Sequence, residues 1–242
     1  MTDTRPPLDA AAKQVTVVLV HGAFVDASGW QPVFDYLSRE GYEVVVVQNS
    51  AVSLTDDVVR TRRAIADASY PVVLVGHSYG GAVITEAGND EKVHYLVYLA
   101  AFVPDLGESV FDLASQEVPG AEPPPLLPPI DGFIRVDPTE FPRAFGADVD
   151  LRQAQFMAAA QRPWGVEAVQ GKITATAWKT KRSSYLIATE DRMIPPEAQR
   201  RMATRANARI EEVQSSHAVM LSRPGEVAAI IKAAAEIETA QS

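Results

Sequence analysis

The segment PVVLVGHSYGG (residues 71–81) joins an apolar run to the pentapeptide Gly76-His77-Ser78-Tyr79-Gly80. The apolar run is typical of a buried strand, and the residues that follow the pentapeptide can begin a helix. A strand, a sharp turn with a serine and a helix form the pattern of a nucleophile elbow. Gly76 and Gly80 are small enough to relieve the crowding at such a turn. We therefore expect Ser78 to be a nucleophile whose Oγ is exposed above the carboxyl edge of a sheet.

A serine hydroxyl needs a base to take its proton, and the chain has four histidines: His21, His77, His94 and His217. His77 adjoins Ser78, and the elbow is expected to turn the two side chains apart. His94 begins a strand-like run, which places it at the wrong end of the sheet. His21 ends the first predicted strand, where we expect its backbone to matter more than its ring. Elimination leaves His217 as the predicted base.

A third group should fix the imidazole tautomer and stabilise its cation. Asp191 follows a short predicted strand, so we expect it at the same carboxyl edge. The order Ser78, Asp191, His217 is one of the known chain orders of such a triad. Two alternatives remain open. Glu190 is adjacent to Asp191 but is expected to point the other way, and Asp105 follows the preceding predicted strand.

Five segments together carry a resemblance to a known family, the α/β-hydrolases of the carboxylesterase kind. They are VLVHGA (18–23), GHSYGG (76–81), YLAAFVP (98–104), EDRMIPPE (190–197) and SHAVML (216–221). More narrowly, the chain is similar to the small cytosolic enzymes related to plant methyl-salicylate esterases and hydroxynitrile lyases, and to their bacterial counterparts. The serine motif is common to a whole superfamily, whereas the ordered set of five is more specific.

The resemblance implies a serine hydrolase of small carboxylic esters that forms an acyl-enzyme and needs no metal or organic cofactor. It assigns the backbone N–H groups of Ala23 and Tyr79 to an oxyanion hole, which stabilises the charge of the tetrahedral intermediate. The related lyases carry a threonine and a lysine where this chain has Gly22 and Ala218. A lyase on the same scaffold is one alternative function. A small-molecule receptor that retains the triad and turns over slowly is another, because fold does not determine function.

Alternating predicted strands and helices indicate an α/β fold, with a mostly parallel six-stranded sheet and helices on both faces. We expect residues 1–14 to be a flexible tail and residues 15–103 and 181–242 to form the hydrolase core. Residues 104–180 show no convincing strand, and six prolines lie within residues 119–129. Short helices are predicted there at 139–145, 150–161 and 164–170. We therefore expect 104–180 to be a helical cap insertion that covers the active site.

Apolar side chains near the predicted edge and in the cap are the candidates for the substrate pocket. They are Phe24, Tyr79, Phe102, Phe111, Phe133, Phe156, Met157, Trp164, Trp178 and Met220. A Met or an aromatic residue at such a position is also common in an ordinary core, so each candidate has a purely structural alternative.

Composition limits the remaining function classes. The formal net charge is -9, from 22 basic and 31 acidic residues, which argues against nucleic acid or an anionic membrane as a partner. The chain has no cysteine, so it has no disulfide, thiolate metal site or cysteine nucleophile. No apolar run approaches the length of a membrane span, and residues 1–14 lack an apolar signal core. We therefore expect a cytoplasmic protein that acts on a small-molecule ester.

Overall fold

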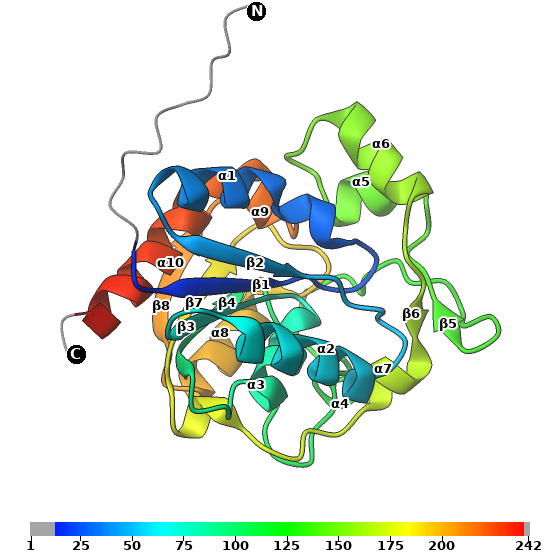
Figure 1. Ribbon diagram of the computed structural model, residues 1–242. Helices are drawn as coiled ribbons and strands as arrows, with labels where there is room; N and C mark the ends of the chain where they lie inside the picture. Colours follow the sequence, from blue (N-terminus) through cyan, green and yellow to red (C-terminus); the bar gives the residue numbers. More distant parts are fainter. Residues whose placement is uncertain (1–12, 240–242) are drawn as a thin grey trace, which may run out of the picture.

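The computed structural model describes residues 13–239, in which one sheet has the strand order β2-β1-β3-β4-β7-β8 (Figure 1). Its strands are β1 (Thr16–Val20), β2 (Glu43–Val47), β3 (Val72–His77), β4 (Val93–Leu99), β7 (Arg182–Ala188) and β8 (Arg209–Val213). All neighbouring strands in this sheet pair in parallel. The predicted six-stranded parallel sheet is confirmed. Residues 1–12 of the predicted tail lie outside the described residues.

Helices cover both faces of the sheet, which explains why its central strands are continuously apolar. Within β1, Val18 and Val20 face one core, whereas Val17 and Leu19 face the other. One face is covered by α2 (Leu54–Asp67), α3 (Gly80–Ala87) and α8 (Pro196–Arg205), and the other by α1 (Gln31–Arg39) and α10 (Pro224–Thr239) (Figure 1). Two short helices, η1 (Ala27–Trp30) and α9 (Val219–Ser222), lie beside α1. Among residues 13–239, none of the helices combines the length and apolar character that crossing a membrane requires.

Residues 104–180 contain several short elements rather than one continuous domain of regular structure. The helices are α4 (Val110–Ala114), α5 (Phe141–Ala144), α6 (Leu151–Ala159), α7 (Val166–Gln170) and η2 (Ala177–Lys179). The expectation that no strand occurs here is wrong, because β5 (Phe133–Ile134) pairs antiparallel with β6 (Trp164–Gly165). Strands of two residues are too short to show a hydrophobic period. In Figure 1, α5, α6, β5 and β6 gather at the end of the sheet away from both chain termini.

Candidate active site

Ser78 lies at the sharp turn between β3 and α3. Its φ of 56° is in the left-handed region that residues other than glycine rarely adopt. Backbone hydrogen bonds hold it there, since Ser78 N donates to Leu99 O (3.3 Å) and Phe102 N donates to Ser78 O (3.1 Å). The flanking glycines are required, because a Cβ on Gly76 would lie 2.6 Å from the carbonyl oxygen of Gly80. The strand–turn–helix geometry expected around Ser78 is present.

Ser78 has only 7% of its surface exposed, so the residue as a whole is more enclosed than the expected position above an open sheet edge. The loop that follows β1 lies directly against it. A Cβ on Gly22 would be 2.6 Å from the Cβ of Ser78, so only glycine permits this approach. The contact joins segments more than fifty residues apart in the sequence, and the local pattern around Ser78 carries no sign of it.

Asp191 and His217 are brought into direct contact, whereas no hydrogen bond joins His217 to Ser78 among the described residues. His217 Nδ1 donates to Asp191 Oδ2 at 2.7 Å, and both residues are buried. The same carboxylate accepts from Gln199 Nε2 (2.9 Å) and, through Oδ1, from the backbone of Met193 (2.7 Å) and Ile194 (3.0 Å). Such a bond keeps a proton on Nδ1 and leaves Nε2 of His217 as an acceptor.

The two alternative acids have other partners. Asp105 forms an ion pair with Lys179, and the side chain of Glu190 accepts a hydrogen bond from Gln214 Nε2 (2.7 Å). Asp105 is partly exposed, which contrasts with the buried carboxylate of Asp191. Of the three acids considered from the sequence, Asp191 is the one hydrogen-bonded to His217.

The ring of His217 is also held by two aromatic neighbours. The ring centroid of His77 lies 4.7 Å away, and that of Phe145 lies 4.8 Å away at an interplanar angle of 85°. His77 Nε2 donates to the carbonyl oxygen of His217 at 2.8 Å. Burial and the neighbouring His217 place the pKa of His77 well below its usual value, so His77 is neutral. The sequence reasoning set His77 aside, whereas the structure connects the residue before Ser78 to the backbone of His217.

The loop after β1, which contains Ala23, is fixed by the ring of His21. Asn49 N donates to His21 Nε2 (2.9 Å), and His21 Nδ1 donates to the carbonyl oxygen of Gly22 (2.8 Å). Burial lowers the pKa of His21, which favours the neutral ring that these two bonds require. The ring of His21 thus makes two hydrogen bonds of its own, although the sequence led us to expect its backbone to matter more than its ring. Phe24, next in the loop, has a φ of 66°.

The candidates for the pocket fall into three groups. Trp164 lies 5.5 Å, between ring centroids, from both Phe24 and Tyr79, so these three form one buried aromatic cluster. Phe111 and Phe156 are 53% and 71% exposed. Four further candidates lie outside this cluster. Met220 is buried in the core beneath α1 and α10, and the indole of Trp178 donates to Pro104 O (3.0 Å). Phe133 is exposed in β5, and Met157 is partly buried.

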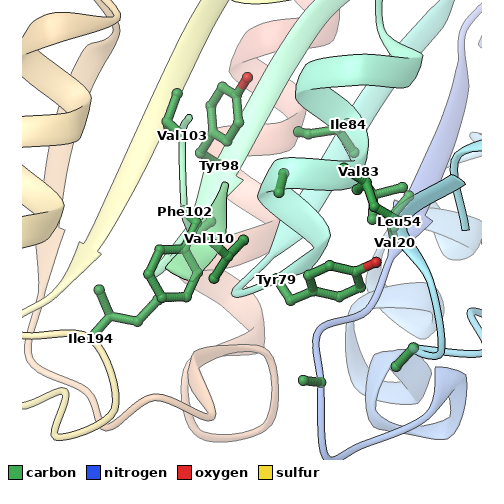
Figure 2. Close-up of a cluster of buried hydrophobic side chains, with 14 of the residues drawn as sticks. Val20, Leu54, Tyr79, Val83, Ile84, Tyr98, Phe102, Val103, Val110 and Ile194 are labelled. Atoms are coloured by element: carbon green, nitrogen blue, oxygen red, sulfur yellow. The ribbon is translucent and has the colours of Figure 1, made fainter. Parts of the chain in front are cut away.

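A cavity of about 560 Å³ lies beside this centre, between the chain that follows α4 and helix α8. Phe102 and Ile194 line it, and Figure 2 shows their side chains close together. Phe102 is hydrogen-bonded to the backbone of Ser78, and Ile194 to the carboxylate of Asp191. The cavity therefore borders the acid loop and lies one hydrogen bond away from the turn, but Ser78, Asp191 and His217 are not among its lining residues. No group of three or more His, Asp or Glu side chains within residues 13–239 is arranged to hold a metal ion.

Comparison with known proteins shows which family and which relatives the chain is similar to. The sequence profile of the alpha/beta hydrolase family matches residues 17–230. The alpha/beta hydrolase nvfD of Aspergillus novofumigatus is 28% identical over 242 aligned residues, which cover 90% of this chain and 96% of that protein. A carbendazim hydrolyzing esterase of Nocardioides sp. is 34% identical over 116 residues, 42% of this chain and 48% of that one. The solved structure of a pyrethroid hydrolase from Sphingobium faniae shares the fold, with a TM-score of 0.80 at 21% identity over 92% of this chain and 98% of that chain.

Proposed function

The chain belongs to the alpha/beta hydrolase family, and we propose that it is a serine esterase that cleaves small carboxylic esters through an acyl-enzyme on Ser78. The observation that carries the proposal is the buried hydrogen bond between His217 Nδ1 and Asp191 Oδ2, in a histidine whose backbone is bonded to His77, the residue before the serine at the strained turn. The names of the relatives, a hydrolase and an esterase, agree with this chemistry.

In the proposed reaction, Ser78 Oγ attacks the carbonyl carbon of the ester while its proton passes to His217 Nε2. The carbonyl oxygen becomes an oxyanion, which the N–H groups of Ala23 and Tyr79 stabilise. His217 then gives the proton to the departing alkoxide, the bond to the alcohol breaks, and the acyl group stays on Ser78. Asp191 stabilises the imidazolium that exists between the two transfers.

Water completes the cycle by the same route in reverse. Its proton passes to His217 Nε2 while its oxygen bonds to the acyl carbon of the acyl-enzyme. The second tetrahedral intermediate collapses, Ser78 Oγ leaves with the proton from His217, and the carboxylic acid is released. No step in this scheme requires a group that the chain itself does not supply.

The cavity next to Phe102 is our candidate for the larger group of the substrate. Its volume of about 560 Å³ is within the usual range of small-molecule pockets. Met193, Ile194 and Met202 make part of its wall apolar, whereas Arg201 and Glu117 make another part polar. Compact apolar esters are the substrate class that we expect. A relative named for hydrolysing carbendazim and a structure named for pyrethroids make these two compounds the first elaborate substrates to try.

We also propose that residues 104–180 act as a cap over a core made of 15–103 and 181–242. Two contacts support this division. Phe145, which follows α5, packs against His217, and Trp164 of β6 packs against Tyr79.

A turnover screen tests the proposed function. Aryl esters of increasing acyl length, simple lactones, carbendazim and a pyrethroid are assayed with the wild type and with Ser78→Ala as the blank. We expect the wild type to turn over short-chain esters and Ser78→Ala to have no activity above background. Ser183→Ala is the matched control, since it removes a buried hydroxyl distant in the sequence from the elbow. A single acylation without turnover would favour the receptor alternative, and full activity in Ser78→Ala would overturn the proposal.

A further inference from the structure

Asp57 is a fully buried carboxylate in the first turn of α2. Its Oδ1 accepts from Ser50 N (2.7 Å) and Ser50 Oγ (3.0 Å), and its Oδ2 accepts from Ala51 N (3.1 Å) and from the hydroxyl of Tyr79 (2.9 Å). These partners are all uncharged donors. Burying a carboxylate costs folding free energy unless hydrogen bonds offset the loss of water. We therefore looked for a function of the buried side chain of Asp57 in its hydrogen-bond partners.

One connection of Asp57 leads to the residue after the proposed nucleophile. Tyr79 is fully buried, and Figure 2 shows its ring extending from the elbow toward Leu54 and Val20. Its hydroxyl bonds to Asp57, while its ring packs against Trp164. Burial and the nearby carboxylate raise the pKa of Tyr79 well above its usual value, so the phenol remains a donor at any assay pH. The far end of Tyr79 is thus attached to α2.

The other connection of Asp57 leads to the loop that follows β1. Ser50 and Ala51, which it holds, come directly after Asn49. Asn49 Nδ2 donates to the carbonyl oxygen of His21 (3.1 Å), and Asn49 N donates to the ring of the same histidine. Ala51 has a φ of 55°, a left-handed conformation that needs support from outside the residue. The carboxylate of Asp57 accepts three hydrogen bonds from Ser50 and Ala51 at this strained position.

We propose that Asp57 is a positioning residue for the oxyanion hole. Asp57 holds the side chain of Tyr79 by accepting a hydrogen bond from its phenol. Through residues 49–51, Asp57 also holds the loop after β1, which contains Ala23. The inference rests on the proposed function, because it takes the N–H groups of Ala23 and Tyr79 as the oxyanion donors. Such donors act on charge that develops in the transition state, so their placement affects kcat more than substrate binding.

Tyr79→Phe is the primary test, because it removes one hydroxyl and keeps the ring, the backbone N–H and Asp57. We expect kcat to fall about tenfold, less than the roughly 10²–10³ that follows outright loss of an oxyanion donor. KM should stay within about twofold of the wild type, because ground-state binding is not changed. Tyr98→Phe is the matched control. It also loses a buried phenol bond, from Tyr98 to Thr85 Oγ1 (3.0 Å), and should lower Tm while leaving kcat unchanged.

Asp57→Asn and the double variant test whether the two residues act together. Asp57→Asn should lower kcat further than Tyr79→Phe, because Asp57 also holds Ser50 and Ala51. Adding Tyr79→Phe to Asp57→Asn should cost no more than about another twofold, since the interaction is already lost. Independent, multiplying losses in the double variant would contradict the proposal. If Asp57→Asn does not fold, Tyr79→Phe still decides the question.

A labelling control separates failure of this inference from failure of the proposed function. Each variant is also treated with a fluorophosphonate, which reacts with an activated serine. A wild type that is neither labelled at Ser78 nor active would overturn both proposals. A wild type that is labelled and active, together with a Tyr79→Phe variant of unchanged kcat, would overturn the role of Asp57 alone.

Discussion

At the scale of single residues, Asp191 illustrates how the surroundings of a carboxylate decide what each oxygen can do. Its Oδ1 accepts from the backbone N–H groups of Met193 and Ile194, and its Oδ2 accepts from Gln199 and His217. The two backbone donors cannot turn away. An amide in place of the carboxylate would keep its oxygen toward them and present its NH₂ group to His217.

Asp191→Asn should therefore favour the wrong tautomer of His217, in which Nε2 carries the proton and cannot accept the one from Ser78. We expect kcat to fall by about 10⁴, the cost known for an acid-to-amide change in a triad. The measurement is steady-state turnover of a short-chain aryl ester. Asp105→Asn is the control, since Asp105 is paired with Lys179 away from the histidine, and it should keep wild-type kcat. The reverse pattern would place the acid after β4 instead.

At the scale of elements, His217 depends on two segments that lie far from it in the sequence. His77, at the end of β3, bonds to its backbone across 140 residues. Phe145, just after α5, packs against its ring and accepts a hydrogen bond from Ala218 N (2.9 Å). The elbow and the segment 104–180 thus both contact the proposed base, so changes in either can alter the orientation of its ring.

Phe145→Leu should lower kcat by about two- to tenfold, because an aromatic pair contributes about 0.5–1.5 kcal/mol and about 1.4 kcal/mol equals a factor of ten. Phe141→Leu is the matched control. Phe141 is equally buried and stacks on Phe145 at 4.8 Å, but among residues 13–239 its ring makes no contact with the ring of His217. Both variants should lose similar stability in urea unfolding. An equal loss of kcat in both would show that only packing, and not the histidine, is affected.

At the scale of the whole molecule, the sequence predicts the parts that local patterns encode. Apolar, β-branched runs predict the buried strands, and glycine spacing predicts the elbow. The positions of Asp191 and His217 after predicted strands predict the one pair of site residues that the structure shows in contact. The roles of His77, Asp57 and the ring of His21 come from contacts between distant segments. No local pattern shows them, because Asp56 and Asp57 both lie in the first turn of α2, where an acid is common for its interaction with the helix dipole alone.

The same buried histidines predict how stability depends on pH. Burial lowers the pKa values of His21 and His77 in the folded protein below the unfolded value of about 6.5. As the pH falls below about 6.5, the unfolded chain binds protons that the folded chain does not, so the free energy of unfolding decreases. Their contribution is therefore complete above this pH, and it is lost in the acid direction at about 1.4 kcal/mol per pH unit for each histidine.

Urea unfolding at pH 7.5, 6.5 and 5.5 checks this dependence. The free energy of unfolding should fall only slightly between pH 7.5 and 6.5 and much more between pH 6.5 and 5.5, because each unfolded histidine is half protonated at about pH 6.5. His77→Gln should remove about half of that fall, because one of the two histidines no longer titrates. Tyr98→Phe, which removes a buried hydrogen bond but no histidine, is the control and should keep the wild-type slope. A fall that is unchanged in His77→Gln would contradict the assignment.

The central claim, that Ser78 is a nucleophile activated by His217 and Asp191, has one most direct test. The protein is treated with a fluorophosphonate, and the modified residue is located by peptide mass spectrometry. The wild type should carry a single phosphonyl group on the peptide that contains Ser78, and Asp191→Asn should be modified far more slowly. An adduct on any other serine, or an active wild type with no adduct, would contradict the claim.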